Sequence, residues 1–228
     1  SITKNEGFFN AVDIILPEGC IAHPPPNKPA ALGSFHPACE ITEAVCIALS
    51  NVAPGRAQPQ LYKIGMPNAV MGMDDNGMMW MDQGVDCRSM DTSAVQGIDG
   101  WGSAPCALAS LLLSQAEDAE SRFPIISHDR EMVTDTEGPG RWRGMPGSIN
   151  VKQVLQPATA MAWMVTQTHP LRGMCGGDDA IPYENYFEVG SPNERKIELT
   201  ASDLLPSGAV IAYQHGGGAV NKSMIIRE

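Results

Sequence analysis

Two arginines in a glycine-rich stretch have side chains suited to binding an anion, and an aspartate lies in the same stretch. The stretch from Thr134 to Gly147 reads TDTEGPGRWRGMPG, and so much glycine and proline predicts a built turn and not a helix or strand. Arg141 and Arg143 flank Trp142, which predicts both guanidinium groups on one side of an extended segment and the indole on the other. Guanidinium groups match the geometry of carboxylates and phosphates, so we expect Asp135, Arg141 and Arg143 to face a subunit contact or an anionic intermediate. A tight hairpin with solvated arginines or a surface ion pair is the alternative.

The four glycines of this stretch permit positive φ angles or a close approach of two backbones. We expect that alanine cannot replace three of them, namely Gly140, Gly144 and Gly147. The loop should therefore hold one shape.

Methionines gather on both sides of a second turn, Asp74-Asp75-Asn76-Gly77. The pair Asn76-Gly77 is typical of a two-residue type I′ hairpin turn. Alternation along the two strands would place thioethers on one face, from Met71, Met73, Met79 and Met81. Methionine adapts to ligands and to partner chains, so we expect Met79 and Met81 beside a substrate pocket or at a subunit interface. Packing in the core is the simpler alternative.

The five histidines are isolated from one another. His36 and His215 lie beside turns, where side chains are often presented to a cleft, and both are further candidates for a pocket or an interface. The six cysteines form no CxxC pair and are expected to be reduced thiols. The nearest approach to a zinc module is the set His23, His36, Cys39 and Cys46. Those spacings fit no standard zinc module, so we predict no metal site in this chain.

One stretch superficially resembles a phosphate-binding loop, residues 216–223, GGGAVNKS. Asparagine replaces the glycine before the lysine, and only five residues follow Ser223, too few for the helix that such a loop requires. The sequence contains no GxSxG, HExxH or GxGxxG pattern. We therefore identify no complete active site within the chain.

Composition limits the class of protein. With 228 residues and 43% hydrophobic content, the chain can bury a core of its own. A formal charge of −11 and a pI near 4.8 argue against nucleic acid as a partner. No secretory signal and no apolar run near the ~20 residues of a bilayer span occur, so we expect no membrane association and a cytoplasmic location.

The local patterns predict an α+β fold that is rich in glycine, with a few short helices in the N-terminal half and a β-rich C-terminal third. We expect two regions, 1–148 and 149–228, within one compact domain. The expected helices span residues 37–51 and 106–123. The expected strands span residues 11–16, 149–155, 160–166, 196–200 and 209–213. Residues 22–30 read as an extended proline-rich connector, and residues 84–102 as irregular.

Several motifs recur in an order that resembles one known family. They are the stretch 134–147, Glu6-Gly7-Phe8-Phe9, Pro17-Glu18-Gly19-Cys20 with Pro24-Pro25-Pro26, Glu117-x-x-Glu120-x-Arg122-Phe123-Pro124, His169-Pro170-Leu171-Arg172-Gly173 with Gly176-Gly177, and His215-Gly216-Gly217-Gly218. Together they resemble the hydantoinase B family, which includes ATP-dependent hydantoinases, oxoprolinases and the large subunits of acetone and acetophenone carboxylases. The resemblance runs from about Glu6 to Gly218 and matches the C-terminal portion of family subunits that are usually more than twice as long.

The resemblance implies a subunit of a cytoplasmic, multi-subunit, ATP-dependent ketone carboxylase, most similar to the acetophenone carboxylase type of ketone metabolism. Such a ligase joins a small ketone and bicarbonate to give a 3-oxo acid. The implied partners are a hydantoinase-A-like ATP-binding subunit and a complementary N-terminal hydantoinase-B-like subunit, with ATP and a divalent metal bound by these partners and no cofactor by this chain alone. One alternative is part of an ATP-dependent amidohydrolase for a hydantoin, lactam or oxoproline. A purely structural assembly subunit is the other.

Overall fold

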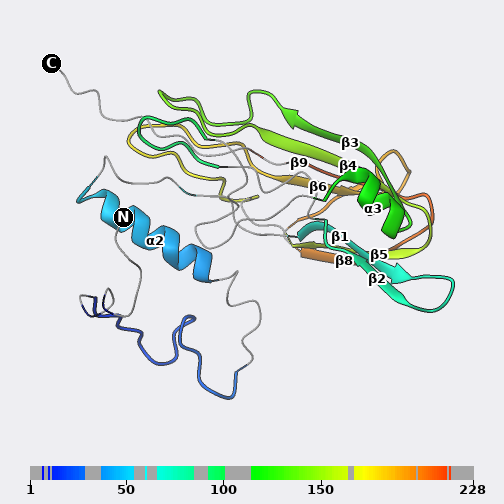
Figure 1. Cartoon of the computed structure of the whole chain (residues 1–228), viewed down its shortest axis with the longest axis horizontal. Coiled ribbons are helices and arrows are strands. Elements are labelled where there is room, and N and C mark those ends of the chain that lie inside the picture. Colours follow the sequence, from blue (N-terminus) through cyan, green and yellow to red (C-terminus); the bar gives the residue numbers. More distant parts are fainter. Residues whose placement is uncertain are drawn as a thin grey trace.

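Two antiparallel sheets form the body of the chain. The computed structural model describes residues 7, 10, 12–28, 37–53, 60, 66–84, 92–100, 114–163, 167–198, 200–214 and 216. Within these residues the chain forms nine strands and two helices longer than one turn, α2 and α3. Figure 1 shows the two sheets as layers, one with β3, β4, β9 and β6 and the other with β1, β2, β5 and β8. The predicted α+β class is confirmed.

The first sheet has four strands in the order β2-β1-β5-β8, all antiparallel. Its strands are β1 Met66–Met73, β2 Met79–Asp82, β5 Ala158–Trp163 and β8 Thr200–Leu205. The methionine hairpin is confirmed, since Met71 pairs with Met81 and Met73 with Met79.

The turn of this hairpin differs from the predicted type I′. Such a turn needs positive φ at both central residues, but only Gly77 has it, at 75°. The Gly77 amide donates to the Asp74 carbonyl at 2.9 Å, and the Asn76 and Met78 amides donate to the Asp74 carboxylate. A longer loop therefore joins the strands because the Asp74 side chain organises it.

The second sheet has five strands in the order β3-β4-β9-β6-β7. Its strands are β3 Ile125–Val133, β4 Gly147–Val154, β6 Glu184–Phe187, β7 Arg195–Lys196 and β9 Val210–Gln214. The glycine-rich stretch is the connection of the β3–β4 hairpin, in which Val133 pairs with Gly147. The predicted turn there is confirmed.

The core lies between the sheets. Its buried members come from both layers and include Val70, Trp80, Ala160 and Leu205 of the first sheet and Ile125, Val154, Phe187 and Ile211 of the second. Helix α3, Ala116–Arg122, adds Ala119 to the same cluster. The Trp80 ring lies 6.0 Å from that of Phe123, the residue that follows this helix.

The first of the two helices was predicted from the sequence. Helix α2, Ala38–Ser50, confirms the helix predicted for residues 37–51. It buries Cys39 and Glu43, however, and exposes Ile41, Val45 and Leu49 by 41%, 52% and 60%. Three of its apolar residues thus face outward.

The helix predicted for residues 106–123 is wrong at Ser114 and Gln115, which precede α3 in non-helical conformation, and residues 106–113 lie outside the described residues. Gln115, the N-cap, has an extended ψ of 152°. The glutamate and aspartate of the first turn, Glu117 and Asp118, favour a helix start at Ala116 through the helix dipole.

Two strand predictions need correction. Residues 12–16 form no strand, and Ile14 and Ile15 are 68% and 84% exposed, because an apolar run needs a neighbouring strand to pair with. The strand predicted for residues 196–200 is divided, since β7 ends at Lys196 in one sheet and β8 begins at Thr200 in the other. The chain crosses between the layers at that point.

The other elements agree with the sequence. Strands β4, β5 and β9 confirm the predictions for residues 149–155, 160–166 and 209–213 in their described parts. Residues 22–28 contain no helix, and residues 92–100 are irregular apart from a single bridge between Val95 and Ile98. Strands β3 and β6 were not predicted. In the described part of the chain no helix has the length and apolar character needed to cross a membrane.

Candidate functional site

The inner face of the five-stranded sheet changes from apolar to polar along its length. Strand β4 turns four residues toward the core, and from the far end these are Val154, Lys152, Asn150 and Ser148, none more than 3% exposed. Buried sheet positions are normally apolar. Three polar side chains in succession therefore mark this half of the face as a candidate site.

A row of polar residues crosses the sheet at the level of Asn150. Arg130 on β3 pairs with Asn150, Asn150 pairs with Tyr213 on β9, and Tyr213 pairs with Asn185 on β6. Directly opposed residues of antiparallel strands point to the same face. We call Arg130, Asn150, Tyr213 and Asn185 the polar row. Strand spacing places its two asparagine Cα atoms about 10 Å apart.

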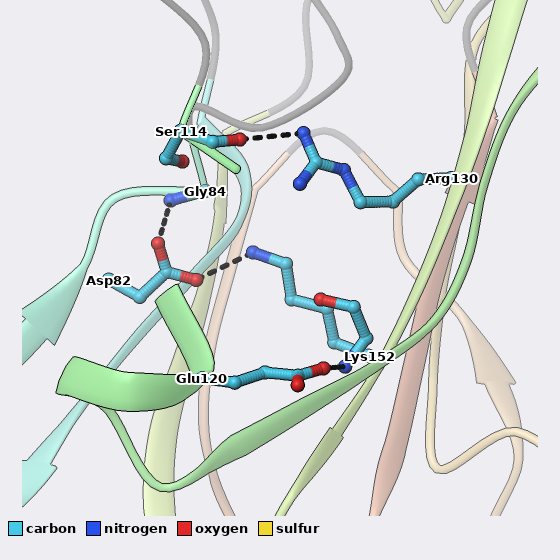
Figure 2. A network of polar contacts seen from close by, with 7 residues as sticks. Asp82, Gly84, Ser114, Glu120, Arg130 and Lys152 are labelled. Carbon is cyan, nitrogen blue, oxygen red and sulfur yellow. Dashed lines mark hydrogen bonds and ion pairs between the residues drawn. The ribbon is translucent and has the colours of Figure 1, made fainter. Parts of the chain in front are cut away.

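An ion pair joins the two sheets at Lys152, the next inward-facing residue of β4 toward the apolar core (Figure 2). The Lys152 Nζ lies 2.6 Å from the Oδ2 of Asp82 on β2, and the two side chains are only 2% and 7% exposed. The other carboxylate oxygen of Asp82 accepts the Gly84 amide at 2.9 Å. Because a charge buried without its partner is strongly unfavourable, this pair fixes how β2 and β4 meet.

The Arg130 side chain reaches the same region from β3. Figure 2 shows its guanidinium group approaching the space beside Lys152 and Ser114. Its Nη2 donates to the Ser114 carbonyl at 2.8 Å, and the side chain is half-buried. Within the described part of the chain this is the guanidinium's hydrogen bond, and a guanidinium group has five N–H donors with which it could also bind a ligand.

The carboxamide of Asn150 is the most unusual group in the row. The residue is fully buried, and neither its Nδ2 nor its Oδ1 has a hydrogen-bond partner among the residues that the structure describes. Leaving such a group unpaired costs about 1–3 kcal/mol, and such exceptions in native proteins call for an explanation. A carboxamide presents a donor beside an acceptor, so its natural complement is another amide.

Glycine-containing loops close this end of the sandwich. β4 and β6 both begin here, and β9 ends here, since Gln214 pairs with Ile149 and with Glu184. Residues 134–146 precede β4 directly. They are held to residues 92–100 by the Gly100 amide, which donates to the Arg143 carbonyl at 2.8 Å, and by the Met145 amide, which donates to the Thr92 carbonyl at 3.0 Å.

Gly100 has no room for a side chain at this crossing. A Cβ there would lie 1.9 Å from the Thr92 carbonyl oxygen and 2.7 Å from the Met145 nitrogen. Residues 171–181 join the same loops, since the Ile181 amide donates to the Thr136 carbonyl at 3.4 Å. The polar row therefore lies below a set of loops that support one another.

Three of the predicted site residues lie on these loops and not in the polar row, namely Asp135, Arg141 and Arg143. Asp135 is exposed and adopts a positive φ of 60° directly after β3, and Gly140, Gly144 and Gly147 do not share that conformation. The positive-φ explanation for these glycines is wrong, while their tight contacts stay a prediction.

The two arginines differ from their predicted arrangement. The guanidinium carbon of Arg141 lies 4.9 Å from the centre of the Trp142 ring, so this pair shares one side of the loop. Cation–π attraction explains the difference from simple alternation. Arg143 contributes its backbone, which donates to the Asp99 carboxylate at 2.9 Å. Whether Asp135, Arg141 and Arg143 contact an anion stays a prediction.

The remaining candidates are separate from the polar row. Met79 and Met81 lie on the outer face of the other sheet, opposite to the face that carries Trp80. His36 and His215 lie outside the described residues. Within the described part of the chain, no three histidine, cysteine or acidic side chains gather as metal ligands would.

Asn150, Lys152 and Asp82 leave little sign of their role in the sequence. In the segment Ser-Ile-Asn-Val-Lys, polar and apolar residues alternate, and the usual interpretation turns Ile149 and Val151 inward. The structure turns the polar set inward and leaves these two half-buried on the other face. The sequence signal for this site is a strand in which either the apolar or the polar set of alternating residues could face inward.

A separate hollow of about 420 Å³ lies at β6 and β7, lined by Gln167, Thr168, Pro182, Tyr183, Glu184, Lys196 and Glu198. Lys196 Nζ lies 2.5 Å from Glu184 Oε1, and this hydrogen bond is the main cause that lowers the pKa of Glu184 and raises that of Lys196. Burial, followed by its hydrogen bond to Glu184, raises the pKa of Tyr186. These paired charges lie on the outer face of the sheet, opposite to the polar row.

Comparison with known proteins identifies the family. The family model for hydantoinase B/oxoprolinase matches residues 1–220, so the chain belongs to this family. It is 22% identical over 224 residues to the beta chain of a caprolactamase of Pseudomonas jessenii, covering 94% of this chain and 39% of that one. It is 23% identical to the B chain of a putative D-/L-hydantoinase of a Pseudomonas species, covering 95% and 35%, and 21% identical to 5-oxoprolinase of Dictyostelium discoideum, covering 95% and 16%.

Two solved structures share the fold. The ATP-dependent caprolactamase from Pseudomonas jessenii superposes with a TM-score of 0.62 and 18% identity, covering 78% of this chain and 32% of that one. A nucleotide-free acetone carboxylase superposes with a TM-score of 0.53 and 15% identity, covering 75% and 27%. The chain thus spans less than two fifths of each of these relatives. The resemblance to hydantoinase B is confirmed, whereas the likeness to acetophenone carboxylase stays a prediction.

Proposed function

We propose that this chain is the hydantoinase-B-like part of an ATP-dependent, multi-subunit enzyme that opens a cyclic amide, and that the polar row holds the ring. The observation that carries the proposal is the buried carboxamide of Asn150, whose donor and acceptor both lack a partner within the described part of the chain. Family membership supplies the context, because caprolactam, hydantoin and 5-oxoproline, after which three relatives are named, are all rings closed by an amide.

The chemistry of a cyclic amide suits this carboxamide. In a small ring the amide is cis, so its N–H and C=O groups point to the same edge. The Asn150 oxygen can accept the ring N–H while its NH₂ group donates to the ring oxygen. Each net hydrogen bond contributes about 0.5–1.5 kcal/mol, and the bound ring also removes the cost of an unpaired buried amide.

The other members of the row would orient and polarise the substrate. Arg130 is half-buried beside Asn150, so the row approaches solvent at this strand. Its guanidinium group would stabilise negative charge that develops on the ring oxygen or on an attached phosphoryl group. Tyr213 and Asn185 would line the opposite end. Hydrolysis adds water to the amide carbon, breaks the C–N bond and gives the nitrogen a proton.

The nucleotide belongs to the partner in this proposal. ATP held by a hydantoinase-A-like partner would supply the phosphoryl group that activates the ring, and a divalent metal would be held by the partner subunits. The complementary hydantoinase-B-like polypeptide would complete the cavity. Asp135, Arg141 and Arg143 would then face that contact from the loops.

A ketone carboxylase is the second candidate. The fold shared with acetone carboxylase supports it, as does Arg130, because a guanidinium group suits a planar anion derived from bicarbonate. In this case the Asn150 NH₂ group would donate to the ketone oxygen, and its own oxygen would still need a donor. The cyclic amide satisfies both atoms and is therefore preferred. A purely structural assembly role would leave the buried Asn150 carboxamide unexplained.

Substrate profiling of the assembled complex tests the proposal. We expect ADP release and ring opening with a lactam, a hydantoin or 5-oxoproline, and no incorporation of labelled bicarbonate. Asn150→Ala should raise the KM for the ring by roughly 10- to 100-fold, since a loss of about 1.4–2.8 kcal/mol corresponds to one or two factors of ten. The matched control is Asn193→Ala, at an exposed turn. Fixation of labelled bicarbonate into a ketone would overturn the proposal in favour of the carboxylase.

A further inference from the structure

The outer face of the four-stranded sheet carries apolar side chains, and part of this face is open to solvent. Met73, Met79 and Leu204 are 61%, 71% and 75% exposed. Cross-strand pairing joins Met73 to Met79, Met71 to Met81, Met71 to Thr159, Thr159 to Leu204 and Ala69 to Met161, which puts all of these side chains on one face. We call Met71, Met73, Met79, Met81, Met161 and Leu204 the methionine face.

Both faces of this sheet are largely apolar. The opposite face carries Val70, Trp80, Ala160 and Leu205, which belong to the core. A sheet that meets solvent on one side normally alternates apolar and polar residues, whereas strands that are apolar on both faces are typical of sheets covered on both sides. Exposed apolar side chains on this face, interrupted by Thr159 and Ser202, therefore indicate a missing neighbour.

We infer that the methionine face binds the part of the hydantoinase B polypeptide that this chain does not span. The chain covers 39% and 35% of the lengths of two relatives, so more than half of each relative lies outside the match. A remainder of that length would need an apolar surface to pack against, and the methionine face offers exposed apolar side chains on well-paired strands. Methionine side chains adapt to an irregular apolar partner.

A protein surface fits this face better than a small molecule. Ligand sites are concave pockets, whereas the methionine face is one side of a sheet of four paired strands. A flat face across four strands instead suits a broad contact. This inference rests on family membership and not on the substrate, so failure of the cyclic-amide assay would leave it standing.

Methionine oxidation provides a direct measurement with an internal control. Peroxide converts exposed methionine to the sulfoxide at a rate that follows exposure, and peptide mass spectrometry reports each site. Met132 is 57% exposed but lies next to the loops that the complementary polypeptide would also contact, so a free methionine-containing peptide added to both samples serves as the control. The probe is hydrogen peroxide applied to the chain alone, and to the same chain fused to or combined with the complementary hydantoinase-B-like polypeptide.

We expect Met73 and Met79 to be oxidised about tenfold more slowly in the presence of the complementary polypeptide, while the rate at the reference peptide is unchanged. Equal rates in both samples would overturn the inference. So would protection in the chain alone that grows with its concentration, which would indicate a second copy. Protection that requires added cyclic amide or ketone would point to a substrate pocket and would overturn it as well.

Variants of the face give a second measurement. Replacing Met79 and Leu204 with serine should weaken association with the complementary polypeptide by at least about tenfold, because two exposed apolar side chains lose their contacts. Leu155→Ser, which follows β4 at its end away from the loops and is 48% exposed, is the matched control and should associate normally. Both residues are largely exposed in the free chain, so the far-UV circular dichroism should be unchanged. Unweakened association of the double variant would contradict the inference.

Discussion

Replacing Asn150 with leucine separates a ligand-binding role from a structural one. Leucine has nearly the same branching as asparagine but no polar atoms. The Asn150 carboxamide is fully buried with neither atom paired, so the native chain carries a desolvation penalty of about 1–3 kcal/mol at this position. The variant removes that penalty and should stabilise the ligand-free protein.

The expected gain can be measured by thermal unfolding of the assembled complex without substrate. A stabilisation of about 1–2 kcal/mol corresponds to a rise in Tm of about 2–8 °C for a domain of this size. The same variant should lose binding of the cyclic amide, because the ring would no longer find its donor and acceptor. Higher stability with lower activity is the pattern expected when a buried polar group serves function.

A fall in stability would refute this reasoning. It would show that the carboxamide is paired in the native protein, for instance by a buried water, and that its role is structural. Asn193→Leu is the control, since this residue lies at an exposed turn and the change should leave Tm within error. Unchanged binding of substrate by Asn150→Leu would also count against the polar row as the site.

Three further changes test other parts of the site. Asp82→Ala should lower the free energy of unfolding by roughly 3–5 kcal/mol, since it leaves the buried Lys152 ammonium without its carboxylate; urea unfolding that shows a loss below about 1 kcal/mol would contradict a structural ion pair. Gly100→Ala should cost roughly 2–4 kcal/mol, because a Cβ would overlap the Thr92 carbonyl oxygen, and a variant that melts like the parent would disprove the tight crossing. The stabilising effect of the Glu184–Lys196 pair should depend on pH. Because the pKa of Glu184 is lowered in the folded protein, the contribution of Glu184 is present above its ordinary pKa of 4.5 and is lost as the pH falls through its folded pKa. Because the pKa of Lys196 is raised, the contribution of Lys196 is present below its ordinary pKa of 10.5 and is lost as the pH rises through its folded pKa. Both groups are exposed, so the difference in stability between the parent and Lys196→Met should be below about 1 kcal/mol at neutral pH and should shrink as the pH falls below 4.5. A difference that is undiminished in acid would contradict the assignment.

Local patterns in the sequence predicted those elements whose signal is contained in a short segment. Helix α2 follows from apolar residues at helical spacing, and the methionine hairpin follows from Asn76-Gly77 between alternating residues. Residues 12–16 also form a short apolar run that is typical of a strand. They form no strand, however, because strand pairing depends on a neighbouring strand elsewhere in the chain.

The candidate site depended on distant neighbours and was not predicted. Strand β4 alternates in a way that fits either face, and only its pairing with β3 and β9 decides that Asn150 and Lys152 turn inward. Asp82 meets Lys152 across 70 residues of sequence. The predicted candidates Arg141 and Arg143 were found from composition, and they lie on the loops above the row.

The order in which the strands occur along the chain has a consequence for synthesis. Strand β9, the last of the described strands, lies in the middle of the five-stranded sheet, between β4 and β6. A ribosome that has released residues up to 200 has therefore produced both outer parts of this sheet without the strand that joins them. Tyr213, which lies between Asn150 and Asn185, is supplied by that strand. An unfinished chain cannot assemble the polar row, so a truncated product should not compete with the complete one for substrate.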